Sequence, residues 1–199
     1  MRESPRFVTP SRAEQALTAS PERASQMWPG EWAEGSADHR QAVAALEHHP
    51  APPLTVDRWL TEEPPDLEGS QTVLVFAVVW QPRQVELLRD LRIQIMRRAD
   101  RGAQMVLIHP DEGVSDLEAL LQGNLADVAV GIDSSHALRE AYLVDSFPDF
   151  YLIGTDGQVL CADVANEHII EALDAALGGW VPWETEGTDE ESGGEGETP

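Results

Sequence analysis

Apolar residues along the chain concentrate between about residues 72 and 177, in short blocks of two kinds. Residues 73–79 are nearly all apolar, which is typical of a strand covered on both faces in a central parallel sheet. Pro82 follows at a position that suits the first turn of a helix, and the next apolar residues recur every three or four positions. The pattern predicts strands over 73–79, 105–109, 127–131, 150–153 and 158–162, and helices over 82–100, 116–122, 134–142 and 166–177.

The order of these elements indicates the architecture. The early strands are separated by helices, and such connections are long enough for parallel crossovers. The last two strands flank the loop Gly-Thr-Asp-Gly at 154–157, which predicts a β-hairpin. We therefore expect an α/β fold in which a mixed β-sheet is flanked by helices on both faces.

The chain outside this region has a different composition. Residues 1–53 are rich in Pro, Ser, Ala, Glu and Gly, and they predict an irregular extension with one helix over 37–49. Residues 54–178 form the predicted domain. Residues 179–199 form an acidic tail, of which 184–199 carry seven acids and no cation and are predicted to be disordered.

The formal net charge of −23 limits the classes of partner. All 13 basic residues are arginine, which fits either a GC-rich genome or a salt-adapted cytoplasm. An acid excess argues against nucleic acid and anionic membranes, because both need cationic surfaces. No stretch approaches the roughly 18 apolar residues of a membrane span, and the N-terminus has no apolar run typical of a signal peptide. The expected location is cytoplasmic.

The predicted helix over 82–100 is unusual in its charge. It contains or adjoins six of the arginines: Arg83, Arg89, Arg92, Arg97, Arg98 and Arg101. A solvated helix face, a surface for the acidic tail and a surface for an acidic partner are all consistent with this pattern.

Five local features occur in a fixed order. They are the strand entry at 68–76, Trp80 followed by Pro82, His-Pro-Asp-Glu at 109–112, Tyr-Leu-Val-Asp-Ser-Phe-Pro at 142–148, and Phe-Tyr-Leu-Ile-Gly-Thr-Asp-Gly-Gln-Val at 150–159. With these features the segment 54–177 resembles the thioredoxin-like superfamily, in its redoxin branch of disulfide reductases and thiol-specific antioxidants. The resemblance implies a thioredoxin-like fold with a cis peptide bond before Pro148. It does not fix the function.

The departures from that family concern its chemistry. Both cysteine positions of the Cys-x-x-Cys motif are glutamine here, Gln81 and Gln84. Thiol–disulfide exchange needs a thiolate and a second sulfur that resolves the mixed disulfide. A peroxidase of this superfamily needs one cysteine at the same helix N-terminus, and the buried acid of thioredoxins is Val75 here. These changes predict no catalytic residue at this site.

Cys161 is the only cysteine, so an intramolecular disulfide is impossible. We expect it to be a small apolar residue of the last strand, remote from the Trp80 turn. The alternative is a single-cysteine redox protein that works with an external thiol such as glutathione. The spacing of His48, His49, His109, His136 and His168 predicts no metal site, and no cofactor is expected.

The resemblance leaves recognition as the remaining role of the site. In that fold the residue before the cis-proline offers its backbone to an extended peptide, and here that residue is Phe147. Trp80, Gln81 and Gln84 are predicted to line the same groove beside Pro148. The alternatives are that Trp80 is a core residue and that Pro148 has only a steric role.

The leading hypothesis is therefore a non-catalytic thioredoxin-like protein that binds a peptide or protein partner, or assembles with one. The competing hypotheses are the redoxin-type enzyme based on Cys161 and a structural subunit of a larger complex. In the last case the anchors would be tryptophans of the two extensions, Trp28, Trp32, Trp180 and Trp183.

Overall fold

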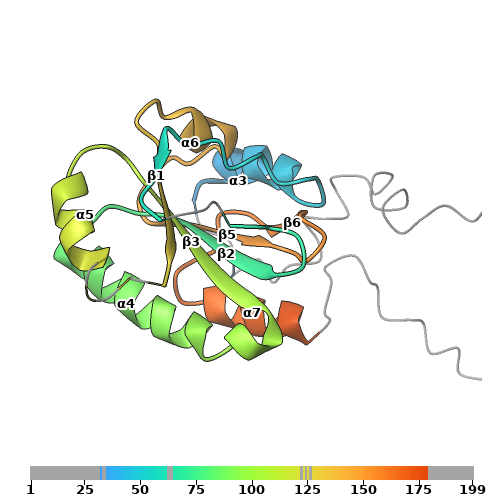
Figure 1. Cartoon of the computed structure of the whole chain (residues 1–199). Coiled ribbons are helices and arrows are strands. Elements are labelled where there is room, and N and C mark those ends of the chain that lie inside the picture. Colours follow the sequence, from blue (N-terminus) through green and yellow to red (C-terminus); the bar gives the residue numbers. More distant parts are fainter. Residues whose placement is uncertain are drawn as a thin grey trace, which may run out of the picture.

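The computed structural model describes residues 32, 35–61, 65–121, 123, 125 and 127–178. Its centre is one six-stranded sheet with the strand order β1-β4-β3-β2-β5-β6 (Figure 1). The strands are β1 Arg58–Trp59, β2 Gln71–Phe76, β3 Ala103–His109, β4 Ala129–Ile132, β5 Asp149–Ile153 and β6 Val159–Cys161. β2, β3 and β4 are parallel, whereas β1, β5 and β6 each run antiparallel to their neighbours. The predicted mixed sheet is confirmed.

Helices cover both faces of this sheet, as predicted (Figure 1). They are α3 Ala37–Val43, α4 Pro82–Met96, α5 Val114–Leu121, α6 Ala137–Ala141 and α7 Ile169–Leu177, with 3-10 turns η2 Ala44–Leu46 and η3 Ala99–Arg101. α4 and α7 lie on one face, and α3 and α6 lie on the other. No helix among the described residues is long and apolar enough to cross a membrane.

The continuous apolar run of β2 is explained by two cores. Val73 and Val75 point to the face of α4, where they join a cluster that includes Leu88. Leu74 and Phe76 point to the opposite face and join the cluster of Tyr142. Because successive side chains of a strand alternate between faces, both faces of a central strand must be apolar.

The strand itself is shorter than predicted. β2 ends at Phe76, although Ala77, Val78 and Val79 remain buried. The backbone N–H groups of Val78 and Val79 donate to the side chains of Gln84 and His109. An apolar run in the sequence indicates which residues are buried, and here the buried residues continue three positions beyond the end of the strand.

The segment 48–60 reaches both edges of the sheet. At one edge, His48 N–H donates to Val159 O at 2.8 Å, and Val159 N–H donates to His49 O at 2.9 Å. At the other edge, β1 pairs with β4. Gly131 permits this approach, because a Cβ atom there would lie 2.9 Å from Cγ1 of Val56. We call residues 48–60 the strap.

The strap belongs to the same folded unit as the sheet. Tyr142 donates its hydroxyl proton to Pro52 O at 3.0 Å, and Val43 of the preceding helix is completely buried. The predicted helix over 37–49 is present as α3 followed by η2. The predicted boundary between residues 53 and 54 falls inside the strap, so residues 35–53 pack on the domain.

Other predictions concern the extensions. Trp32 is buried in the core beside α7, where Ala165 N–H donates to its carbonyl oxygen at 2.7 Å, so its side chain is not a free anchor. Trp28, Trp180, Trp183 and the acidic tail lie outside the described residues.

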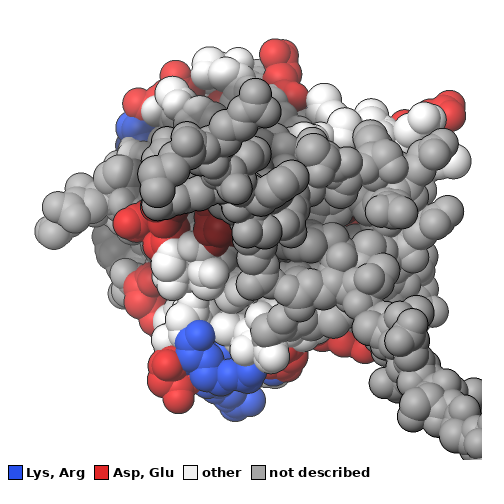
Figure 2. Space-filling view, turned by 90° about the vertical axis from the view of Figure 1, so that its right-hand side faces the viewer, with Lys and Arg blue, Asp and Glu red and all other residues white. Residues whose placement is uncertain are grey.

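Charge is unevenly distributed on the face shown in Figure 2. On its described part, acidic side chains lie at several places, and basic side chains form one cluster near the lower edge and a smaller spot at the upper left. At the end of α4, Arg98 and Arg101 pair with Asp174 of α7, and Arg92 pairs with Asp127. Much of the predicted arginine surface is therefore engaged within the domain.

Candidate functional site

Three segments distant in sequence meet at the carboxyl ends of the parallel strands. Trp80 and Gln81 follow β2, His109 ends β3, and the Phe147–Pro148 pair immediately precedes β5. The Phe147–Pro148 peptide bond is cis. The sheet order places β2 between β3 and β5, which brings the three segments to one place.

Gln84 links two of these segments. Its Oε1 accepts from Val78 N–H at 2.8 Å, while its Nε2 donates to Gln81 Oε1 at 2.8 Å and to Phe147 O at 3.0 Å. An amide side chain has one acceptor oxygen and two donor hydrogens, so each part of the group is engaged. Gln84 is only 4% exposed and does not present its amide to a ligand. The glutamine therefore braces the turn against the Phe147 loop.

Trp80 is the exposed aromatic residue of the site. It is 46% exposed, so the alternative that it is a core residue is wrong. Its ring meets the His109 ring edge-on, with centroids 5.7 Å apart. Gly113 has φ +79°, and a Cβ atom there would lie 3.0 Å from Cε3 of Trp80. The imidazole and the bare backbone of Gly113 thus fix the position of the indole.

His109 is held in one protonation state by its partners. Its Nε2 accepts from Val79 N–H at 3.2 Å, and its Nδ1 lies 2.5 Å from Pro110 O, to which it donates. Both contacts fit a neutral imidazole, because a proton on Nε2 would oppose the Val79 N–H. Burial lowers the pKa of His109. The imidazole acts as a spacer between β3 and the Trp80 turn.

Arg139 supports the Phe147 loop from the other side. Asp133 accepts from the backbone N–H groups of Leu138 and Arg139, which fixes the start of α6. The guanidinium of Arg139 lies 5.0 Å from the centre of the Phe147 ring and donates to Val144 O at 3.1 Å. Phe147 is therefore held by a cation–π contact as well as by Gln84.

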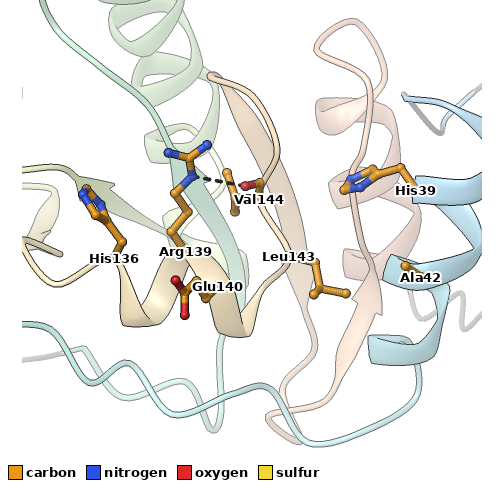
Figure 3. Close-up of a pocket in the computed structure, with 7 residues that line it drawn as sticks. All are labelled: His39, Ala42, His136, Arg139, Glu140, Leu143 and Val144. Carbon is orange, nitrogen blue, oxygen red and sulfur yellow. Dashed lines mark hydrogen bonds between the residues drawn. The ribbon is translucent and has the colours of Figure 1, made fainter.

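A shallow groove of about 610 Å³ lies between α3 and α6, next to this loop. Figure 3 shows its lining residues, and the dashed line marks the hydrogen bond from Arg139 to Val144. Its walls carry His39 and Ala42 from α3, and His136, Arg139, Glu140, Leu143 and Val144 from α6 and the following turn. The mixture of basic, acidic and apolar groups favours no single class of ligand.

Cys161 lies away from the Trp80 turn, as predicted. It belongs to β6, which is separated from β2 by β5, and it is 1% exposed. Burial, and then the carboxyl group of Glu47, raise the pKa of its thiol. No group of three or more His, Cys, Asp or Glu side chains within the described part of the chain is arranged to hold a metal ion.

The structure brings together Trp80, Gln81, Gln84, Phe147 and Pro148, and it adds His109, Gly113 and Arg139. A signal for His109 was present in the sequence, because it directly follows the second buried strand. The carboxyl ends of neighbouring parallel strands meet at one edge of a sheet, which places His109 beside the Trp80 turn. Nothing in the local pattern marks Arg139.

Comparison with known proteins gives structural matches only, since neither family models nor curated proteins match the chain. A solved structure from Neisseria meningitidis, assigned as a thioredoxin, is 18% identical with a TM-score of 0.50, over 55% of this chain and 76% of its own. A protein from Chlorobium tepidum, assigned as a thiol:disulfide interchange protein, is 25% identical with a TM-score of 0.46, over 56% and 83%. A secreted disulfide oxidoreductase from Mycobacterium tuberculosis is 18% identical with a TM-score of 0.46, over 55% and 84%. At this level the likeness concerns architecture alone, and the chain has a thioredoxin-like fold.

Proposed function

We propose that the protein is a non-catalytic thioredoxin-like module that binds an extended peptide or protein segment at the surface of Trp80, Gln81, Phe147 and Pro148. The observation that carries this proposal is the half-exposed Trp80, fixed by His109 and Gly113 at the place where the family carries its reactive cysteines. Exposed tryptophans that are already immobilised are favoured contact residues, because binding costs them little side-chain entropy.

Recognition at this surface relies on side chains more than on strand pairing. The carbonyl oxygen of Phe147 already accepts from Gln84, which leaves one of its two lone pairs for β-pairing with a peptide. The indole of Trp80 offers a flat apolar contact and one N–H donor. The ligand that fits this surface is a segment with an aromatic or aliphatic side chain that contacts Trp80. A cytoplasmic location of the protein is also part of the proposal.

The competing enzyme would depend on Cys161. Its thiol is buried in β6, and its raised pKa keeps the thiolate scarce near neutral pH. A buried neutral thiol is a poor nucleophile towards disulfides and peroxides, which supports the binding role over the redox role.

Peptide selection tests the binding role. A library of extended peptides displayed on phage is selected against the full-length chain, and enriched peptides are titrated with the wild type, Trp80→Ala and Ile93→Ala. Ile93 is the matched control, because it is 45% exposed and lies on α4. We expect Trp80→Ala to weaken binding by about 10- to 30-fold, typical of a tryptophan contact, and Ile93→Ala to leave it unchanged. Equal binding by the two variants, or no enrichment, would contradict the proposal.

Enzyme assays test the absence of redox catalysis. Insulin disulfide reduction and peroxide consumption are measured with dithiothreitol as the reductant. We expect rates equal to those of buffer, because Gln81 and Gln84 provide no sulfur. A rate above buffer that disappears in Cys161→Ser would overturn this expectation and favour the single-cysteine enzyme.

A further inference from the structure

Asp149 is a buried carboxyl group immediately after Pro148. It is 4% exposed and begins β5, opposite Phe76 of β2. Its Oδ2 lies 3.0 Å from the hydroxyl of Tyr151, and its Oδ1 has no hydrogen-bond partner among the described residues. An ionised carboxylate in such a place would be poorly solvated.

The Tyr151 hydroxyl group can donate only one proton, and this limits the protonation state of Asp149. The same hydroxyl oxygen lies 2.7 Å from the carbonyl oxygen of Tyr142, which can only accept. The tyrosine therefore gives its proton to Tyr142, and the contact with Asp149 needs a proton from the carboxyl group. The geometry fits a protonated Asp149 that donates to Tyr151.

The surrounding charges favour the same state. Burial, followed by the nearby Asp163, raises the pKa of Asp149 to about 8, and Asp145 adds to the rise, whereas hydrogen bonds with the Tyr151 hydroxyl and the Phe150 N–H offset only part of it. His39 faces both of those acids, with its ring nitrogens 3.5 Å from Asp145 and 3.7 Å from Asp163. Glu47, close to Asp163, is paired with Arg40 of α3. The pKa of Tyr151 is raised too, so Asp149 is the member of the pair that loses its proton first.

The pair also joins the two ends of a loop. Tyr142 precedes residues 143–148 and Asp149 follows them, so the Tyr151 hydroxyl holds both ends. Arg139 holds the loop near its start through Val144 O, and Gln84 holds it near its end through Phe147 O. Ionisation of Asp149 makes two acceptors compete for one proton, which releases one end of the loop.

We propose that Asp149 is a proton sensor that locks the loop 143–148 when protonated and loosens it when ionised. The loop carries Phe147 of the candidate site, but the sensor does not depend on what that site binds. The folded state keeps a proton that the unfolded chain has already lost, so this group makes the fold less stable as the pH rises towards 8.

Unfolding by urea tests the proposal with the full-length chain. The wild type, Asp149→Asn and Asp116→Asn are compared between pH 5.5 and 9. Asparagine preserves the shape and remains neutral, and Asp116 is an exposed acid in the first turn of α5 that serves as control. We expect the ratio of the unfolding constants of wild type and Asp149→Asn to rise by up to tenfold per pH unit and to level off above pH 8, as one-proton linkage requires. The ratio of the unfolding constants of the wild type and Asp116→Asn should not change with pH.

Two readouts by NMR separate the sensor from a general effect on stability. The ¹³C carboxyl signal of Asp149 in the wild type should titrate near pH 8, and this measurement needs no variant. The amide protection factors of residues 143–147 should fall with pH in the wild type and stay level in Asp149→Asn. A titration midpoint of the Asp149 carboxyl group below about pH 6 would overturn the proposal. That midpoint lies two pH units below the expected one, which is about a hundredfold difference in proton affinity. Equal loop protection in both proteins would overturn it as well.

Discussion

Replacing Arg40 with alanine is expected to lower the free energy of unfolding by about 3–5 kcal/mol, the cost of leaving a buried charge without its partner. Arg40 donates one Nη group to Glu47 and the other to the carbonyl oxygen of Ala162. The Glu47 side chain has no exposed surface, and its one other hydrogen bond within the described part of the chain comes from Ala162 N–H at 3.0 Å. Urea denaturation at neutral pH measures the loss.

Arg92→Ala is the matched control for this prediction. Arg92 forms a bidentate pair with Asp127, but both side chains are partly exposed, and such pairs contribute about 0–1 kcal/mol. The double variant Arg40→Ala with Glu47→Gln should recover part of the loss, because the glutamine is neutral and still accepts from Ala162. If Arg40→Ala costs no more than Arg92→Ala, the ion pair is not a structural link between α3 and the sheet.

The second large effect is expected for Gln84→Ala, which should lower the free energy of unfolding by about 2–4 kcal/mol. The change leaves the N–H of Val78 and the carbonyl oxygen of Phe147 without their partner, and each unsatisfied buried group costs about 1–3 kcal/mol. Chemical denaturation measures the total. Hydrogen exchange should show that residues near Phe147 lose protection earlier than the centre of β2.

Gln81→Ala provides the comparison within the same turn. Gln81 is exposed and gives up one acceptor only, while Gln84 keeps its contacts with Val78 and Phe147. We expect a change below about 1 kcal/mol, the size of a single exposed hydrogen bond. A loss for Gln84→Ala as small as that for Gln81→Ala would show that the brace between turn and loop contributes little.

The central sheet could be predicted because its signals are local. Residues 73–76 are apolar on both faces, Pro82 begins the next helix, and Gly154 and Gly157 mark the hairpin. The burial of Gln84 also had a signal, since it lies four residues before Leu88 on the apolar stripe of α4. Because glutamine is usually exposed, the residue type did not indicate that this position points into the core.

The rest could not be predicted because it depends on contacts between distant residues. The strap pairs with β6 through the main chain of His48 and His49, which leaves no periodic pattern of side chains. β1 has two residues, too few for an alternation to appear. The protonation of Asp149 depends on Tyr151, Tyr142 and Asp163 together, and no one of these residues marks it.

The strap has a consequence for any shortened form of the protein. A sheet edge with bare N–H and C=O groups is a template for pairing with a second chain, and a covered edge removes that hazard. Here the main chain of residues 48–51 occupies the outer side of β6. A fragment cut at residue 54, where the apolar pattern invites a boundary, would uncover Val159 and leave this edge of the sheet open to edge-to-edge aggregation. The residues that look dispensable in the sequence are those that cover this edge of the sheet.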